Sequence, residues 1–196
     1  ALAYQLYENN GVLKRDQVSE YLKNLEQNER KILRELGVKF GRYHVFLHRL
    51  IKPEAVSLRT QLWKNYHQKY FELKPPIFGL NFFDNKNIKN RNFMLLCGFE
   101  KFDNLFVRID ILERLFMQII NSKDEKEIKM TPDMLNLLGC SKENFIKLLK
   151  AMNYRVLKKD DEVFFVYMRK KQIKKTFNKK TTKENPFGVL KNFNFN

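Results

Sequence analysis

The order of helix and strand signals between residues 107 and 168 constrains this fold more than any other feature. Asp110 begins a helical segment, and Glu113, three residues later, completes the pattern of a helical capping box. Apolar residues then recur at helical spacing and define the face that we expect to be buried, which comprises Ile111, Leu112, Leu115, Phe116 and Ile119. These signals predict a helix of about three turns that packs on one side.

A short strand and two helices are predicted next. The strand covers residues 128–130, Thr131-Pro132 opens the first helix, and Gly139 ends it. Ser141 caps the second helix after a turn of three residues. The residues of this helix that we expect to point inward are Phe145, Leu148, Leu149 and Met152.

Residues 154–157 and 163–168 are predicted to pair as a hairpin across Asp160-Asp161. Helix, strand, helix, short turn, helix and hairpin, in this order, are typical of the winged-helix variant of the helix-turn-helix. The helix after the turn is usually the one offered to a nucleic-acid groove. Its outward face carries residues that can contact phosphates, namely Lys142, Asn144, Lys147 and Lys150. Lysines on an exposed helix also serve solvation alone, and both interpretations stay open.

The first half of the chain reads as helical with one extended segment. One helix ends at Asn9-Asn10-Gly11, a second covers residues 16–25, and a third is closed by Gly37. Residues 38–47 suit a short extended or irregular segment. Pro53 takes the first-turn position of a longer helix, whose predicted apolar stripe is Ala55, Leu58, Leu62 and Tyr66, with Trp63 beside it.

Composition indicates where subdomains begin and end. Residues 74–91 contain Pro75-Pro76, Gly79 and four Asn with little periodicity, which favours an internal break. We therefore predict an α+β fold, mainly α with small β-hairpins. A helical accessory subdomain covers residues 1–73, and a linker or irregular segment covers 74–91. A winged-helix-like subdomain follows at 92–168, and a basic disordered tail with a terminal apolar motif covers 169–196.

The net charge of +16 is unevenly distributed. Much of the excess of Lys over Arg, seen beside 20 Asn and 18 Phe, fits an AT-biased coding sequence. Half of the net charge lies between residues 169 and 183, where Phe177 could stack on a base while cations bind a polyanion. These cations are Arg169, Lys170, Lys171, Lys174, Lys175, Lys179, Lys180 and Lys183. A solubilising or linker role is the alternative.

A short apolar motif follows the basic segment. Such a motif often docks onto its own domain or onto a partner. Its residues are Pro186, Phe187, Val189, Leu190 and Phe193.

The chain carries no signal for catalysis, metal binding or a membrane span. We find no phosphate-binding Gly-rich loop and no nucleophile elbow. His44 and His48 lack a nearby pair of Glu residues, so we expect no metal site. Cys97 and Cys140 cannot form a disulfide framework, which suits a reducing compartment and, with no secretion signal visible, a cytoplasmic location. We expect Cys97 to be buried and Cys140 partly buried.

Six stretches together resemble the C-terminal region of bacterial superfamily 2 ATP-dependent RNA helicases, which are similar to the mitochondrial degradosome RNA helicase. They are LAYQLYENNGVL (2–13), LGVKFGRYHVFL (36–47), LIKPEAVSLRTQLW (50–63), VRIDILERL (107–115), LLGCSKENFIKLLKAMNYR (137–155) and NPFGVLKNF (185–193). The matching residues we single out are Gly41, Arg42, Tyr43, Lys52, Pro53, Trp63, Asp110 and Glu113. His48 and Asn153 depart from the pattern, which has Pro and Gly there.

The resemblance implies a motor of two RecA-like domains, upstream of Ala1, that binds ATP and Mg. Helicases of this kind unwind duplex RNA with a 3′ overhang and can cooperate with an exoribonuclease. The present chain would be their non-catalytic accessory region, engaging RNA in metabolism or decay, with no catalytic residue of its own. Arg42 and Tyr43 would contact RNA or lock their segment against a helix. A free-standing winged-helix DNA-binding regulator and a docking module for a nuclease or ribosome are the alternatives.

Overall fold

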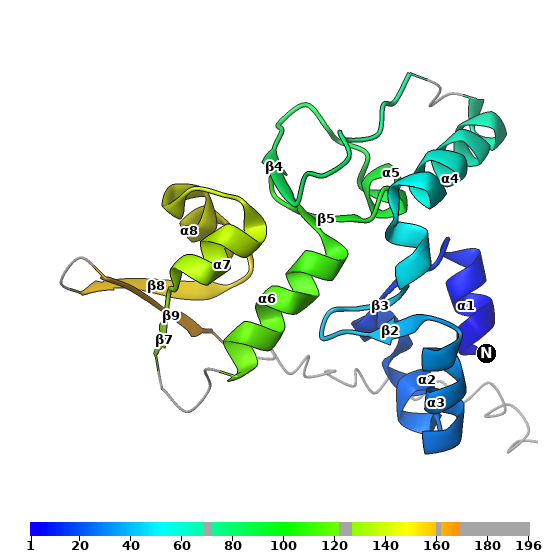
Figure 1. Ribbon diagram of the computed structural model, residues 1–196, viewed down its shortest axis with the longest axis horizontal. Coiled ribbons are helices and arrows are strands. Elements are labelled where there is room, and N and C mark those ends of the chain that lie inside the picture. The colour runs from blue at the N-terminus through cyan, green and yellow to red at the C-terminus, as the bar shows by residue number, and fades with distance from the viewer. Residues whose placement is uncertain (69–71, 122–126, 160–161, 169–196) are drawn as a thin grey trace, which may run out of the picture.

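The computed structural model describes residues 1–68, 72–121, 127–159 and 162–168. Within them the fold is α+β, with eight α-helices and three small antiparallel sheets of three strands each (Figure 1). The helices are α1 (Leu2–Glu8), α2 (Ser19–Asn24), α3 (Gln27–Glu35), α4 (Pro53–Tyr66), α5 (Arg91–Leu96), α6 (Ile109–Asn121), α7 (Pro132–Leu138) and α8 (Lys142–Ala151). The strands are β1 (Val12–Lys14), β2 (Val38–Phe40), β3 (His44–Leu47), β4 (Phe82–Asp84), β5 (Phe99–Phe102), β6 (Leu105–Arg108), β7 (Ile128–Lys129), β8 (Tyr154–Lys159) and β9 (Glu162–Tyr167).

The first sheet has the order β1-β3-β2 and packs with α1, α2 and α3 around a small apolar core. Asn10 and Gly11, both with positive φ, end α1 as predicted. The single helix predicted at 16–25 was wrong in detail, because a 3-10 turn (Arg15–Val18) precedes the shorter α2. The extended segment predicted at 38–47 is the hairpin of β2 and β3.

Helix α4 begins at Pro53 as predicted, but the predicted buried face was wrong. Leu58, Leu62 and Tyr66 are 58%, 59% and 84% exposed. The helix instead buries Val56 and Thr60, together with the half-buried Trp63, against a cluster that includes Phe93. Thr60 is tolerated there because its hydroxyl donates to the carbonyl of Val56 at 2.8 Å. Apolar residues occur on two sides of this helix, so its neighbours and not its periodicity decide which side is buried.

The second sheet has the order β4-β6-β5. The hairpin of β5 and β6 turns at Asp103-Asn104 as predicted, with Asp103 at φ 53°. Strand β4 lies inside the segment that we expected to be irregular, and its Phe82 pairs with Val107. The segment 74–91 therefore contributes to the fold, while the domain boundary proposed there stays a prediction.

Helix α6 runs through the middle of the molecule (Figure 1). It lies between the first sheet and the last module, which is formed by β7, α7, α8, β8 and β9. Its predicted apolar face is buried in the largest core cluster. The predicted capping box was wrong, because the helix begins at Ile109 and places Asp110 inside the first turn. Asp110 accepts from the amide of Ile111 and pairs with Arg108, while the carboxylate of Glu113 lies against residues 42–44.

The last module contains β7, α7, α8, β8 and β9 in that order, with the sheet order β7-β9-β8. Gly139 adopts a left-handed conformation at the end of α7, and the Ser141 hydroxyl accepts from the amide of Asn144 at 3.3 Å. The predicted inward face of α8 is buried. These element predictions are confirmed. None of the helices in the described residues is long and apolar enough to span a membrane.

Candidate nucleic-acid interface

Helix α8 exposes the cations that the sequence singled out. Lys142, Lys147 and Lys150 are exposed, and Asn144 is half-buried, with its side-chain oxygen accepting from the Lys147 ammonium at 3.4 Å. The burial of Phe145, Leu148 and Leu149 turns this lysine-bearing side of the helix toward solvent. A polyanion could therefore reach α8 without rearrangement of the core.

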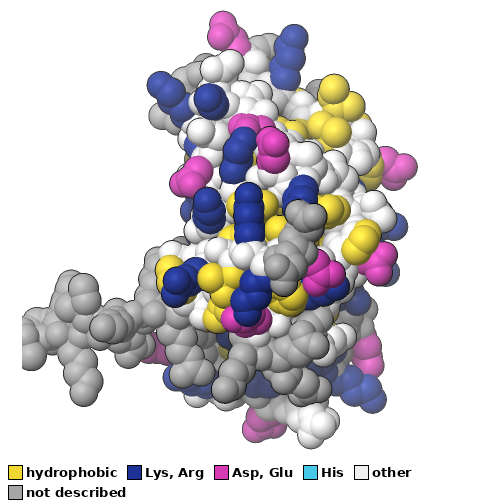
Figure 2. All heavy atoms as spheres, turned by 90° about the vertical axis from the view of Figure 1, so that its left-hand side faces the viewer, with side chains coloured by type: hydrophobic (Ala, Val, Ile, Leu, Met, Phe, Trp, Pro, Cys, Tyr) yellow, Lys and Arg dark blue, Asp and Glu magenta, His cyan; other side chains and the backbone are white. Residues whose placement is uncertain are grey.

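The hairpin of β8 and β9 adds further cations beside α8. Arg155, Lys158 and Lys159 are exposed on β8. Two nearby lysines are partly neutralised, since Lys159 pairs with Glu127 at 2.5 Å and Lys129 pairs with Glu162. Figure 2 shows this end of the molecule, where basic side chains are spread among acidic and hydrophobic ones. Residues 127–159 and 162–168 together hold seven Lys and Arg against four Asp and Glu, a modest positive excess.

The predicted basic tail and the terminal apolar motif lie outside the described residues. Lys52 and Pro53 lie at the start of α4, and Trp63 packs against Phe93 with ring centroids 5.6 Å apart. Lys52, Pro53 and Trp63, three of the residues on which the family resemblance rests, therefore belong to the beginning and the packing of α4 and not to α8.

The Gly41-Arg42-Tyr43 motif forms the turn between β2 and β3, and the carboxylate of Glu113 lies against it. The backbone amides of Arg42, Tyr43 and His44 all donate to this carboxylate, the last two at 3.0 and 2.8 Å. Successive amides that converge in this way make an anion-binding nest. Here the anion is a side chain of the same protein, and it fixes the turn to α6.

Gly41 is required by this arrangement. A Cβ atom at position 41 would lie 2.3 Å from the carboxyl carbon of Glu113, well inside van der Waals contact. Arg15 adds a further tie, because its guanidinium donates to the carbonyl of Gly41 at 2.7 Å. The motif thus has a structural explanation that depends on the glycine and on backbone amides.

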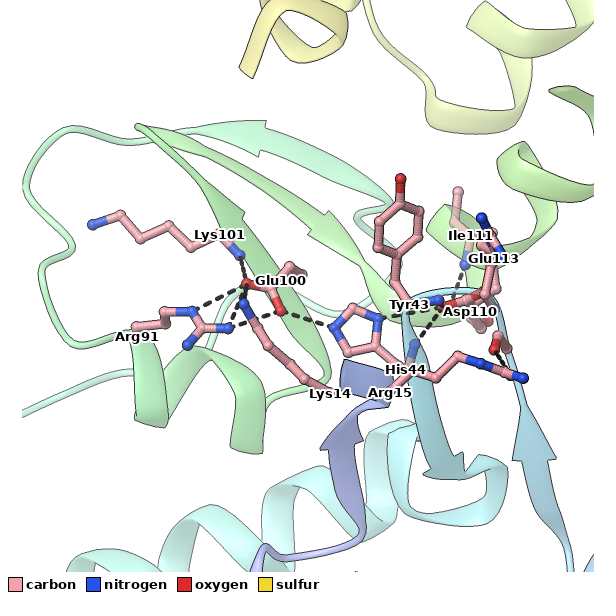
Figure 3. Close-up of polar contacts among 12 residues, drawn as sticks. Lys14, Arg15, Tyr43, His44, Arg91, Glu100, Lys101, Asp110, Ile111 and Glu113 are labelled. Carbon is pink, nitrogen blue, oxygen red and sulfur yellow. Dashed lines mark hydrogen bonds and ion pairs between the residues drawn. The ribbon is translucent and has the colours of Figure 1, made fainter. Parts of the chain in front are cut away.

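His44 joins the two halves of the chain through two carboxylates (Figure 3). Its Nε2 lies 2.8 Å from Glu100 of β5, and its Nδ1 lies 3.3 Å from Glu113 of α6. Carboxylates only accept hydrogen bonds, so both contacts are satisfied together by the doubly protonated imidazolium. Arg91 donates to both oxygens of Glu100, and Lys14 lies 3.8 Å from it. We call Lys14, His44, Arg91, Glu100 and Glu113 the His44 network.

Burial and hydrogen bonding act in opposite directions on the pKa values of this network. Burial alone would lower the pKa of His44, but the hydrogen bonds that His44 donates to Glu100 and Glu113 outweigh it and raise the pKa above its ordinary value. Burial alone would raise the pKa of Glu100, but hydrogen bonds from His44 and Arg91 lower it to about 2. Both shifts favour the ionic form of the pair that His44 makes with Glu100.

Sequence reasoning did not find this network. Glu100 and Glu113 follow His44 by 56 and 69 residues, so no local spacing connects them. One local signal was present, since Glu100 interrupts the apolar pattern of a predicted strand and a charge there needs a partner. In the described part of the chain, no group of three or more His, Cys, Asp or Glu has the arrangement of a metal site.

Comparison of the chain with protein-family models, with curated proteins and with solved structures finds no match.

Proposed function

We propose that this chain is a non-catalytic accessory region of an ATP-dependent RNA helicase, and that its last module is a winged helix that engages RNA. The resemblance of six sequence stretches supports the helicase assignment. The order β7, α7, α8, β8, β9, with a short turn before α8, supports the winged-helix assignment. ATP and Mg²⁺ would be bound by motor domains outside this chain, and an exoribonuclease is the partner that the resemblance implies.

The exposed lysines of α8 are the observation on which the proposal depends. An exposed helix with three cations, beside a hairpin that exposes Arg155 and Lys158, can neutralise several phosphates at once. Each phosphate contact to a single strand contributes about 0.7 to the slope of log affinity against log salt. The interaction is therefore measurable as a salt dependence.

The test compares the binding of a labelled single-stranded RNA at several salt concentrations. Replacing Lys142, Lys147 and Lys150 with Gln should reduce the salt slope by about 2. A matched variant with Gln at three exposed lysines of the first half, Lys23, Lys31 and Lys39, controls for net charge and should leave the slope closer to that of the parent. Equal slopes for both variants would contradict a role for α8.

Two measurements separate the proposal from its alternatives. The chain alone should hydrolyse no ATP, and RNA-stimulated turnover would contradict the non-catalytic assignment. Sequence-selective binding to duplex DNA, stronger than binding to single-stranded RNA, would favour a free-standing winged-helix regulator.

One surface favours protein docking as a second candidate function. A groove of about 410 Å³ near α1, α3 and α4 is lined mainly by apolar residues, among them Tyr7 and Leu36, which are 79% and 64% exposed. Exposed apolar surface of this kind often marks a protein contact.

Docking through the terminal apolar motif is tested separately, by deleting residues 185–196. Loss of a nuclease or ribosome partner with RNA affinity intact would support docking through that motif.

A further inference from the structure

A cleft lies between the first half of the chain and the last module. It has a volume of about 360 Å³, within the range of small-molecule sites. Its walls come from the start of the 3-10 turn before α2, the turn between β2 and β3, the inner side of α6, and strands β7, β8 and β9. The His44 network holds the β2–β3 turn in place, so one wall of the cleft is fixed by buried hydrogen bonds.

Aromatic rings line much of this cleft. Tyr43 lies against Phe116, with ring centroids 4.0 Å apart, and Tyr154 meets Tyr167 edge to face at 5.3 Å. Tyr167 is 50% exposed and forms part of the rim. Burial raises the pKa of Tyr154 to about 12 and also raises that of Tyr43, so both phenols are neutral at physiological pH. Neutral aromatic rings at a partly open site are what an unstacked base can stack on.

Two arginines accompany the rings. Arg42 is exposed at the cleft, and Arg15 also lines it while donating to the Gly41 carbonyl. Among the described residues that line the cleft, Asp16 carries the one carboxylate. A guanidinium beside aromatic rings suits a nucleotide, because the rings take the base and the cation takes the phosphate.

We propose that this cleft binds an unstacked base of single-stranded RNA, with Tyr167 as the stacking residue at the rim and Arg42 as the phosphate contact. The inference rests on the proposed function and adds to it a base-binding site separate from the exposed lysines of α8. RNA bound there would bridge the first half of the chain and the last module.

The experiment measures the affinity of the full chain for a short oligouridylate and for an abasic strand of equal length and charge. Tyr167→Ala should weaken binding to the oligouridylate by about 5-fold or more, with no change in salt slope, because the lost contact is uncharged. The same variant should bind the abasic strand like the parent chain. Tyr167→Phe keeps the ring and should restore the affinity.

Arg42→Gln provides a second, independent readout. It should reduce the salt slope by about 0.7 while its backbone amide still binds Glu113. Tyr66→Ala on α4 and Arg49→Gln are matched controls, since both residues are exposed away from the cleft. 2-Aminopurine placed along the RNA should show fluorescence quenching when the parent chain binds, which tests stacking without any variant.

The outcomes are distinguishable. If the parent chain binds RNA but Tyr167→Ala matches it on both strands and 2-aminopurine is not quenched, the cleft assignment is wrong and a protein partner becomes the favoured occupant. The proposed function would still stand in that case. If the parent chain binds no RNA, both proposals fail.

Discussion

The carboxylate of Glu113 lies against the backbone of Gly41, so closely that a Cβ atom at position 41 would come within 2.3 Å of the carboxyl carbon. The next three residues donate their amides to the same carboxylate. A side chain at position 41 would push the carboxylate away from these three amides, so the turn needs glycine at its first position. It also explains why Arg42 can keep its side chain exposed, since its backbone makes the structural contact.

Gly41→Ala and Glu113→Ala should both destabilise the protein. The first displaces a carboxylate that holds three amides, and we expect the free energy of unfolding to fall by about 2–4 kcal/mol. The second also removes a partner of His44, and we expect a loss of about 3–5 kcal/mol. Urea denaturation measures both, with Glu35→Ala on the exposed surface as a control near zero.

The double variant tests whether these two residues act as one unit. Once Glu113 is an alanine, the added Cβ at position 41 meets no carboxylate. The combined loss should therefore be smaller than the sum of the single losses by about 1 kcal/mol or more. Simple additivity would show that the close approach has no energetic role.

Stability should depend on pH through the His44 network. The folded pKa of His44 lies above its ordinary value of 6.5, so the folded state binds more protons than the unfolded state above that pH. The stabilisation is complete below about pH 6.5 and is lost as the pH rises through the folded pKa. Glu100 acts oppositely, since its pKa falls from 4.5 to about 2 and its contribution is lost as the pH drops through that interval.

The measurement is the free energy of unfolding in urea at a series of pH values. We expect a decline above about pH 6.5 for the parent chain. The decline should be absent in His44→Gln and kept in His48→Gln, because His48 lies outside the network. A decline that persists in His44→Gln would assign the pH dependence to other groups.

The two apolar sides of α4 should respond differently to truncation. Val56→Ala removes buried methyl groups and should cost about 2 kcal/mol of unfolding free energy. Leu58→Ala and Leu62→Ala remove exposed groups and should change stability by less than about 0.5 kcal/mol. Losses of similar size on both sides would mean that the exposed side is covered in solution.

The two cysteines should react at different rates with a thiol reagent. Burial raises the pKa of Cys97 to about 12 and that of Cys140 to about 11, so neither is an activated thiolate. Cys140 is half-buried and should be modified slowly in the folded protein, whereas Cys97 should react only after unfolding. Counting modified thiols by mass spectrometry, with and without urea, checks this. Faster reaction at Cys97 would contradict its burial.

Local chemistry made much of the second half predictable. Gly139 and Ser141 mark helix ends through backbone conformation and side-chain capping, and both act within a few residues. The buried side of α4 was not predictable, because it depends on Phe93 and its neighbours beyond the helix. The role of Glu113 was misread for the same reason, since the capping-box pattern is local while its real partners lie 69 to 71 residues earlier. Sequence reasoning placed the exposed lysines of α8 but could not find the cleft, whose walls come from six separate parts of the chain.

The distance in sequence between the β2–β3 turn and Glu113 also sets an order of events during translation. At roughly 5–20 residues per second, the ribosome needs several seconds to add the residues that separate them. Throughout that time the carboxylate that accepts from the amides of Arg42, Tyr43 and His44 in the folded protein has not yet been synthesised. Limited proteolysis of nascent chains stalled at increasing lengths should show protection of the Arg42 peptide bond only after residue 113 has left the exit tunnel. Until then these three amides lack the acceptor that they have in the folded protein, and the chain itself supplies it only when Glu113 reaches the turn.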